Sequence, residues 1–364
     1  MAPPEDSSLP AVLDVFLSGL LFHDIGFTGL DSAPTPGAEI WTEGMGQSPG
    51  GIANFAVALS RLGLRTALAA AFGDDPTGVL LWDELAGAER IDLTRSRRFP
   101  GWSTPVTVSL AYDGDRALVT HGRPPPLTPD ELIGTPPPSR AAVVHLGAEP
   151  QEWIGTAAAA GTLVFADAGW TEADRHAAAV LAQLPHCHAF LPNADEAMAY
   201  TGTADPRAAL ARLADLVPLA VVTCGAEGAH AVDNTTGETA SVPGLDVDAR
   251  DTTGAGDVFG AAMVHGTLAG RPLADRLRFA GLAAALSVRW IGGAAAAPRW
   301  TDLTDWRDAL PAGSGADALR REYAFLDDTL PPPAPARAPF TGPVPARVPL
   351  AGSSEPPPPA QHEP

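Results

Sequence analysis

Lysine is absent from this 364-residue chain, and all 23 of its basic residues are arginines. This absence excludes several ways of binding phosphate or activating a carbonyl group. A Walker A loop and a protein kinase each need a lysine beside the phosphates, and Schiff-base catalysis needs an amine. Any phosphate bound here must therefore be held by backbone N–H groups, by arginine or by a metal ion.

Cysteine, positive charge and long apolar runs are also scarce. The two cysteines, Cys187 and Cys224, supply neither a disulfide framework nor a zinc-ligand set, which is typical of the reducing cytoplasm. The formal net charge of −20 disfavours nucleic acid and anionic membrane surfaces as partners. No stretch is long enough to span a membrane. The apolar run 11–22 contains Asp14 and follows acidic residues, so it predicts a buried strand rather than a signal sequence.

The composition divides the chain into four parts. Residues 1–10 form a polar leader that we expect to be flexible, and residues 11–312 have the pattern of one folded domain. Residues 313–330 predict a C-terminal helical extension. Residues 331–364 are saturated with proline, alanine and glycine, so they cannot bury enough apolar surface to offset the entropy of ordering. We predict that this tail is disordered.

Short apolar runs alternate with alanine-rich helical segments along the folded part. We expect strands at 12–22, 66–72, 141–146, 163–166, 189–191 and 219–223, and helices at 52–62, 75–84, 205–216, 258–268 and 273–288. Apolar strands separated by helices predict an α/β fold with a doubly wound, mainly parallel sheet that is covered by helices on both faces. Residues 105–120 instead alternate polar and apolar around Asp113-Gly114, which predicts a hairpin outside that sheet. A further short strand is expected near Ile40 and Trp41.

One segment, residues 251–257, has the residue types of an anion-binding turn that opens a helix. The first N–H groups of a helix lack internal partners, and the helix dipole adds positive character there. Gly254 and Gly256 have no Cβ, so a phosphate could approach these N–H groups closely. Asp257 would stand beside the anion and could take the proton of an acceptor hydroxyl. Alone, the same pattern also fits a glycine-rich turn with Asp257 as a helix cap.

Four segments ahead of this turn carry further candidate residues. Gly19 is followed five residues later by Asp24, whose carboxylate could accept several hydrogen bonds from paired hydroxyls. In residues 50–54, Gly50 and Gly51 would let a substrate approach the backbone, and the amide of Asn54 could both donate and accept.

The other two segments each follow an expected strand. In residues 193–196, Asn193 and Glu196 fall near one another on a helical face, a spacing that fits a magnesium-positioning carboxylate and a capping box equally well. Residues 223–228 contain Thr223, Gly225 and Gly228 in a turn after a strand.

In this order the five segments resemble the ribokinase-like (PfkB-type) carbohydrate kinases, over residues 10–312. The resemblance implies that Asp257 is the catalytic base and that Gly254, Ala255 and Gly256 form the anion hole. It assigns the remaining matched residues to three groups: substrate-binding Asp24, Gly50, Gly51 and Asn54; nucleotide-binding Asn193, Thr223, Gly225, Gly228 and Thr253; and metal-binding Glu196, for Mg²⁺ through water, and Asp251, for a monovalent cation such as K⁺. One departure is at Asp167, where many members have Asp-x-Asn-x-Arg and this chain lacks the arginine.

The implied activity is ATP-dependent phosphorylation of a primary hydroxyl of a sugar or sugar-like substrate, with ATP and Mg²⁺ as cofactors. A nucleoside kinase of the same fold is the alternative, and a non-catalytic binding protein is a third. The hairpin and the strand near Trp41 resemble the β lid of the family, with lid strands near 38–48 and 104–121. Because such lids often pair between subunits in this family, a homodimer through the lid is also implied.

Overall fold

The computed structural model describes residues 12–112, 115–169, 173, 175–311 and 313–327. The expected leader (1–10) and proline-rich tail (331–364) lie outside the described residues. In the described part, no helix is both long and apolar enough to cross a membrane.

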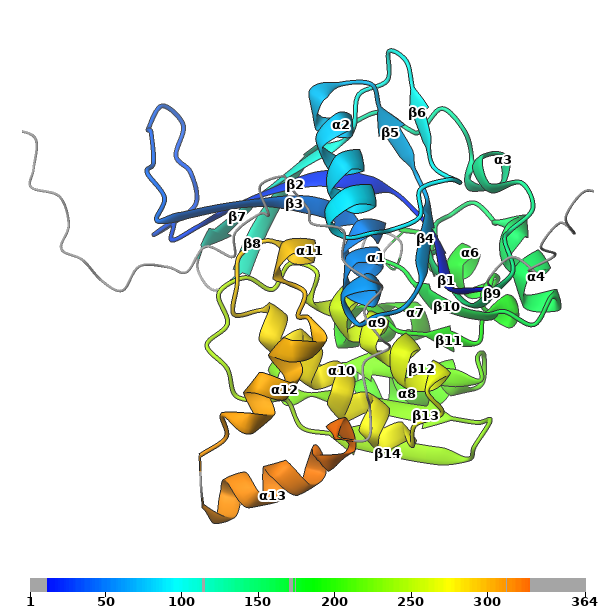
Figure 1. The fold of residues 1–364 in the computed structure, drawn as a ribbon, viewed down its shortest axis with the longest axis vertical. Helices are drawn as coiled ribbons and strands as arrows, with labels where there is room; N and C mark the ends of the chain where they lie inside the picture. The colour runs from blue at the N-terminus through cyan, green and yellow to red at the C-terminus, as the bar shows by residue number, and fades with distance from the viewer. Residues whose placement is uncertain (1–11, 113–114, 170–172, 174, 312, 328–364) are drawn as a thin grey trace, which may run out of the picture.

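A mostly parallel sheet forms the centre of the molecule (Figure 1). Within the described ranges it has eight strands, in the order β14-β13-β12-β11-β10-β9-β1-β4. These strands are β1 (Leu13–Ser18), β4 (Thr66–Ala69), β9 (Ser139–His145), β10 (Leu163–Asp167), β11 (Ala189–Phe190), β12 (Leu219–Thr223), β13 (Ala229–Asp233) and β14 (Glu238–Val242). Neighbouring strands from β4 to β12 pair in parallel, whereas β13 and β14 add an antiparallel edge. The predicted α/β fold with a mainly parallel sheet is confirmed, but the antiparallel edge was not expected.

Helices cover both faces of this sheet, as Figure 1 shows. The helices of the described part are α1 (Ile52–Arg61), α2 (Pro76–Asp83), α3 (Pro129–Ile133), α4 (Glu152–Ala159), α6 (Ala177–Leu181), α7 (Ala194–Thr201), α8 (Pro206–Ala214), α9 (Ala255–Leu268), α10 (Leu273–Ser287), α11 (Gly293–Ala296), α12 (Trp300–Asp308) and α13 (Ser314–Glu322). The last of these falls within the expected extension 313–330, of which 328–330 lie outside the description.

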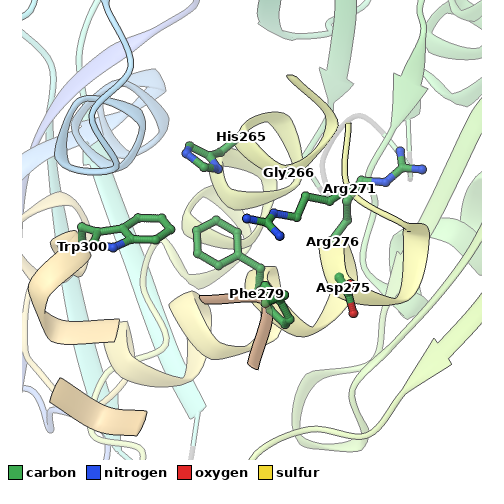
Figure 2. Close-up of a pocket in the computed structure, with 8 residues that line it drawn as sticks. His265, Gly266, Arg271, Asp275, Arg276, Phe279 and Trp300 are labelled. Atoms are coloured by element: carbon green, nitrogen blue, oxygen red, sulfur yellow. The ribbon is translucent and has the colours of Figure 1, made fainter. Parts of the chain in front are cut away.

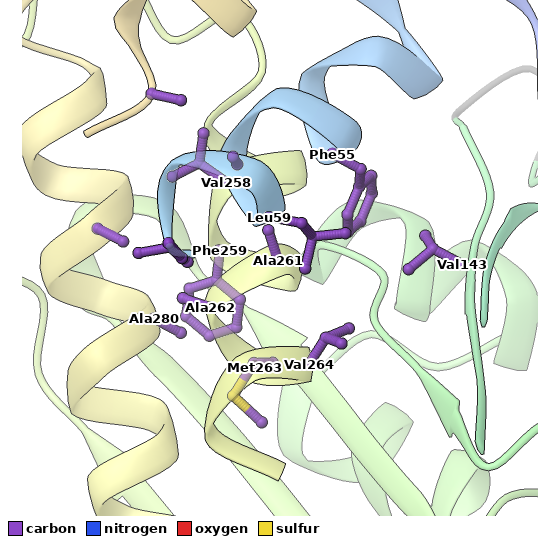
Figure 3. Packing of buried hydrophobic residues seen from close by; sticks show 14 of the residues in the cluster. Phe55, Leu59, Val143, Val258, Phe259, Ala261, Ala262, Met263, Val264 and Ala280 are labelled. Carbon is purple, nitrogen blue, oxygen red and sulfur yellow. The ribbon is translucent and has the colours of Figure 1, made fainter. Parts of the chain in front are cut away.

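Two apolar layers follow from the alternation of side chains along the strands. Leu17 of β1 is buried in one layer with α1, α9 and α10, and the adjacent Phe16 faces the other layer, where its ring meets Trp153 of α4 edge-on at 5.7 Å. Figure 3 shows the first layer, where Phe259 and Met263 of α9 lie among side chains of the neighbouring helices. This packing fixes α9, which carries residues 255–257, against the carboxyl ends of the strands.

A second sheet projects from the body, to the left in Figure 1. In the described part it has four strands in the order β3-β2-β7-β8: β2 (Leu21–Thr28), β3 (Gly44–Gly51), β7 (Val106–Tyr112) and β8 (Asp115–His121). The predicted hairpin is present as the antiparallel pair β7–β8, although its turn residues 113–114 are not described. A separate short pair joins β5 (Ala71–Gly73) to β6 (Arg97–Phe99).

Two predictions for this region were wrong. Residues 12–22 are not one strand, because the chain turns at Gly19 and enters the second sheet as β2. A Cβ on Gly19 would lie 2.9 Å from Cβ of Ile52, so only glycine lets the chain pass the start of α1 there. The strand expected near Ile40 begins instead at Gly44. Its glycine-rich sequence has little β propensity, and pairing with β2 decides its conformation.

Candidate functional site

The helix α9 begins at the carboxyl ends of the strands with the predicted turn. Gly254 precedes it in the left-handed conformation, with φ of 73°, which favours glycine. Asp251 closes the loop before it, since its Oδ1 accepts a hydrogen bond from the Thr253 N–H over 2.9 Å. Its Oδ2 accepts one from the Gly292 N–H over 2.8 Å, which ties the turn to the loop before α11. These two hydrogen bonds of Asp251 hold the loop in front of the first N–H groups of α9. Asp257 lies in the first turn of that helix.

Two side chains from other elements meet Asp257. Asn54 of α1 donates a hydrogen bond from Nδ2 to Asp257 Oδ2 over 2.9 Å. His145, the last residue of β9, places Nε2 3.5 Å from Asp257 Oδ1. The parallel register sets Asp167, at the end of β10, directly beside His145. Ligand atoms of His145, Asp167 and Asp257 lie within 4.8 Å of one another, so these three side chains are close enough to share a proton or a small cation.

The electrostatics of this cluster follow from burial and from the closeness of its charges. Burial raises the pKa of Asp167 to about 6, His145 opposes this shift, and Asp257 adds to it. Burial alone would lower the pKa of His145, but the hydrogen bond and the charge of Asp257, together with the charge of Asp167, raise it overall. The imidazole therefore favours its charged form more than an ordinary histidine does.

A cavity of about 280 Å³ lies between the second sheet and the turn at residues 251–257, which we call the signature turn. Polar and small residues from both sides line it: Asp24, Gly26, Ser48, Gly51, Thr107, Ser109, Arg116, Thr120, Asp251, Thr253, Gly292 and Gly293, with Phe22 and Leu118 as its apolar side chains. Arg116 of β8 crosses this space and donates to the hydroxyl of Thr253 over 3.0 Å. Hydroxyls of five side chains and two carboxylates border this cavity, and such groups suit a small polyhydroxylated ligand.

Asp24 stands in this cavity, on β2 rather than at the end of the first strand. Burial, with smaller contributions from Asp257 and Asp251 and an opposing one from Arg116, raises the pKa of Asp24 to about 7. Gly50 lies on the paired strand β3, and a Cβ there would sit 2.0 Å from Asp24 Oδ2. Gly50 thus makes room for the Asp24 carboxylate, a use that the sequence did not reveal, whereas a Cβ on Gly51 would lie 2.3 Å from the Leu20 carbonyl oxygen.

The predicted nucleotide-binding residues other than Thr253 lie at the ends of β11 and β12. Asn193 is the N-cap of α7 and forms a full capping box with Glu196, each side chain bonding the backbone N–H of the other. A parallel bridge sets Asn193 beside Thr223, and the next turn holds Gly225 and Gly228 at positive φ.

Two features of the Glu196 carboxyl bear on its role. It serves as a helix cap, and burial, followed by the charge of Asp167, raises its pKa to about 7, with a smaller contribution from Asp257. The capping box is therefore present, and it does not decide whether Glu196 also acts on a metal.

A second, much smaller cavity of about 10 Å³ lies near the far end of α9 (Figure 2). His265, Phe279 and Trp300 surround it. Its volume holds no more than about one water molecule. It is separate from the residues of the signature turn, so we exclude it as a substrate site.

The structure thus brings the predicted residues into three neighbouring groups. Asp24, Gly51, Asp251 and Thr253 border the larger cavity; Asn54 and Asp257 are hydrogen-bonded; and Asn193, Glu196 and Thr223 adjoin at the strand ends. Sequence reasoning missed His145 and Arg116. The sequence could have indicated His145, because it is a polar residue at the end of a buried strand. It could not indicate Arg116, because the role of that residue depends on how the hairpin folds over the turn.

Comparison with known proteins identifies the family. A model described as pfkB family carbohydrate kinase matches residues 35–300. The chain belongs to the pfkB family of carbohydrate kinases. The resemblance read from the five motifs is confirmed, as is the class of enzyme, a phosphotransferase that acts on an alcohol group.

The relatives of this chain carry different names. A fructokinase of Klebsiella pneumoniae is 31% identical over 287 residues, which cover 71% of this chain and 91% of that protein. A ribokinase of Schizosaccharomyces pombe is 34% identical over 124 residues, but these cover only 32% of this chain and 39% of that protein.

Two solved structures show the fold. The ribokinase of Arabidopsis thaliana, complexed with ribose and ATP, aligns with a TM-score of 0.66 and 22% identity over 81% of this chain and 98% of that one. An adenosine kinase of Sinorhizobium meliloti aligns with a TM-score of 0.65 and 22% identity over 85% and 99%. The predicted ribokinase-like fold is confirmed. Because sugar and nucleoside kinases share it, the fold alone does not separate them.

Proposed function

We propose that this kinase transfers the γ-phosphoryl group of ATP to a primary hydroxyl of a sugar, with Asp257 as the catalytic base. The observation that carries the proposal is the position of Asp257. Its carboxylate lies in the first turn of α9, is held by Asn54 over 2.9 Å, and is close enough to Asp24 of the cavity to raise the pKa of that residue. A hydroxyl placed there would lose its proton to Asp257 as the phosphoryl group arrives.

The sugar would bind in the 280 Å³ cavity under the second sheet. The Asp24 carboxylate offers up to four acceptor sites to paired hydroxyls, Gly50 gives that carboxylate room, and Gly51 borders the cavity. Asn54 supports this role because its Oδ1 is buried without a hydrogen-bond partner in the described structure, which leaves an acceptor for a sugar hydroxyl. The second sheet would exclude water, which otherwise competes for the phosphoryl group.

The phosphates would meet backbone groups rather than lysine. The N–H groups of Gly254, Ala255 and Gly256 would supply donors, with that of Ala255 released from the Thr252 carbonyl oxygen to which it donates over 3.3 Å, and the start of α9 adds the positive end of the helix dipole. Removal of one donor of this kind costs roughly 3–4 kcal/mol of transition-state stabilisation. Asn193, Thr223, Gly225 and Gly228 would hold the nucleotide, with Thr253 at the junction of the two ligands.

Magnesium fits the carboxyl groups between these sites. Asp257 raises the pKa of both Asp167 and Glu196, and Asp167 raises that of Glu196, so a divalent cation would relieve repulsion there. Bound Mg²⁺ neutralises phosphate charge. Glu196 would hold it through water, since Mg²⁺ keeps most of its hydration. Potassium would bind near Asp251, which joins the turn to the loop before α11.

Two further assignments belong to this proposal. We assign the kinase to the cytoplasm, where its free thiols, Cys187 and Cys224, stay reduced. We also propose a homodimer through the second sheet, supported by the exposed apolar side chains Met45 and Val119 on the face that points away from the cavity. Sedimentation of the native chain and of Val119→Lys tests the dimer, because the lysine should shift a dimer towards the monomer.

Release of ADP over a panel of acceptors tests the function. Fructose, ribose and other monosaccharides are compared with adenosine, inosine and pseudouridine, at fixed ATP and Mg²⁺. We expect turnover with a monosaccharide and none with nucleosides. Turnover restricted to a nucleoside would overturn the sugar assignment, and ADP release that persists unchanged in Asp257→Asn would overturn the assignment of Asp257 as the base.

A further inference from the structure

The Asp257 carboxylate has two oxygens, and only one of them is accounted for by the residues assigned so far. Oδ2 accepts the hydrogen bond of Asn54 over 2.9 Å. Oδ1 faces His145, whose Nε2 lies 3.5 Å away. The motifs of the sequence include no residue at position 145, so the second partner of the base is a feature of the fold.

Three neighbours hold His145 in place. It is the last residue of β9, and its backbone carbonyl oxygen accepts a hydrogen bond from Gln151 Nε2 over 3.1 Å. Asp167 is its register neighbour on β10. The ring of Phe55 packs edge-on against the imidazole at 5.8 Å. The imidazole therefore has little freedom to turn away from Asp257.

Helix α1 links both partners of the base. Asn54 and Phe55 are successive residues of α1, so the same helical turn that bonds Asp257 Oδ2 also supports the histidine opposite Oδ1. Gly260 on α9 makes this approach feasible, because a Cβ there would sit 2.4 Å from the Phe55 ring. Phe55 reaches across the first layer toward Val143, two residues before His145 on β9, in Figure 3.

We infer that His145 is a positioning residue for the catalytic base: it donates from Nε2 to Asp257 Oδ1 and, with Asn54 on Oδ2, turns the carboxylate toward the acceptor hydroxyl. Hydrogen bonds among catalytic groups are often long before substrate binds and shorten in the reacting complex, which fits the 3.5 Å separation. This inference rests on the proposed function, because it takes Asp257 as the base. Asp167 keeps the imidazole oriented from the neighbouring strand.

The consequence is a specific division of kinetic effects. A group that fixes the angle of the base without contacting the sugar affects kcat and leaves KM for the sugar unchanged. Misplacement of a catalytic group by 1 Å can lower the rate by as much as a hundredfold. Loss of the His145 N–H should therefore lower kcat roughly tenfold to a hundredfold.

The test compares His145→Met with His145→Gln. Both side chains are unbranched and similar in length, but only glutamine carries an N–H that can reach Asp257. His188→Ala is the matched control, because His188 also packs edge-on against a phenylalanine, Phe165, at 5.6 Å and does not contact Asp257. All proteins are passed over a chelating resin and assayed with added Mg²⁺ only, so that loss of a bound transition metal cannot imitate loss of a positioning residue.

We expect His145→Met to lose kcat with KM within twofold of the native value, and His145→Gln to recover to within about threefold of the native kcat. His188→Ala should keep its native kcat. Equal rates in Met, Gln and native enzymes would overturn the inference, and so would equal losses in Met and Gln. Asp257→Asn, assayed beside them, distinguishes failure of this inference from failure of the proposed function. If Asp257→Asn stays active, Asp257 is not the base, whatever the His145 variants do.

Discussion

Asn54 donates a hydrogen bond from its side-chain amide to Asp257 over 2.9 Å, across 203 residues of sequence. This bond joins the N-terminal helix α1 to α9, where the free helical N–H groups lie. It also explains why the two glycine-rich motifs of this family belong together in space. The proposed base is not an isolated carboxylate after a turn, because Asn54, from the other end of the domain, is hydrogen-bonded to it.

Asn54→Ala should therefore lower kcat/KM roughly tenfold to a hundredfold, since a hydrogen bond to a charged group contributes about 1.5–3 kcal/mol. Steady-state kinetics on the identified sugar measures this loss. Asn234→Ala is the control, because that amide donates to the Ala214 carbonyl oxygen over 2.7 Å, outside the candidate site. Similar losses in both variants would mean that general destabilisation, not the bond to Asp257, is responsible.

Sugar affinity should depend on pH through Asp24. Its pKa is raised to about 7, so the carboxyl is largely protonated below neutrality and offers fewer acceptor sites. KM for the sugar should rise as the pH falls from 8 to 6, and Asp24→Asn should bind weakly with little dependence on pH. A KM for the native enzyme that is constant over this range would contradict the role of Asp24.

The same shift has a consequence for stability. A carboxyl with a raised folded-state pKa binds more protons in the folded than in the unfolded chain between about pH 4 and pH 7, so its contribution to stability falls as the pH rises through that window. Asp24→Asn should thus melt at a higher temperature than the native chain at pH 8 although it binds sugar worse. A lower melting temperature at pH 8 would show that the carboxylate is needed for the fold.

Magnesium dependence should separate the two uses of Glu196. Glutamine also serves in a capping box, so Glu196→Gln should barely change the melting temperature. Because it removes a charge beside the hydrated ion, the Mg²⁺ concentration for half-maximal rate should rise severalfold at fixed ATP. Glu131→Gln is a matched control, since Glu131 forms the same box with Thr128 at the start of α3 and is outside the candidate site. Superimposable Mg²⁺ curves for the native and Glu196→Gln enzymes would leave Glu196 as a cap only.

Acid should destabilise the fold through His265. This residue is 8% exposed between Phe279 and Trp300, and burial lowers its pKa to about 4. The folded chain then binds fewer protons than the unfolded chain between pH 4 and the ordinary value of 6.5, so stability is lost as the pH falls through that window. The difference corresponds to about 3 kcal/mol.

Melting temperatures at pH 7.5 and 5.0 test this effect. His265→Gln cannot gain a charge, so it should lose less stability between these values than the native chain does. His121→Gln, on the exposed strand β8, should behave like the native chain. An equal fall in all three proteins would assign the acid sensitivity to other groups.

Much of the fold could be predicted because it depends on local patterns. Continuous apolar runs such as 141–146 and 219–223 are strands that are buried on both faces, and the helices between them require a parallel sheet. The break at Gly19 could not be predicted, since the residues on both sides are equally apolar and the change of sheet depends on contact with Ile52. The edge strands β13 and β14 were missed because each has only five residues and the run 234–237 between them has the composition of a loop.

The candidate site likewise has a part that the sequence predicts and a part that it does not. Asp257 and the glycines around it follow from the chemistry of a helix N-terminus, which is a local property. The partners of Asp257 depend on which strands and helices meet, so the place of Asn54 was open and His145 was missed. The use of Gly50 as space for the Asp24 carboxylate is likewise a tertiary fact that no spacing encodes.

The most direct test of the whole account is the turnover of Asp257→Asn with the sugar that the native enzyme phosphorylates. Asparagine keeps the size of the side chain and can still pair with Asn54, but it cannot accept the hydroxyl proton. We predict that folding and ATP binding stay close to native, measured by melting temperature and by calorimetric titration with ATP, while turnover collapses. Retention of more than a tenth of native turnover would contradict the assignment of Asp257 as the base.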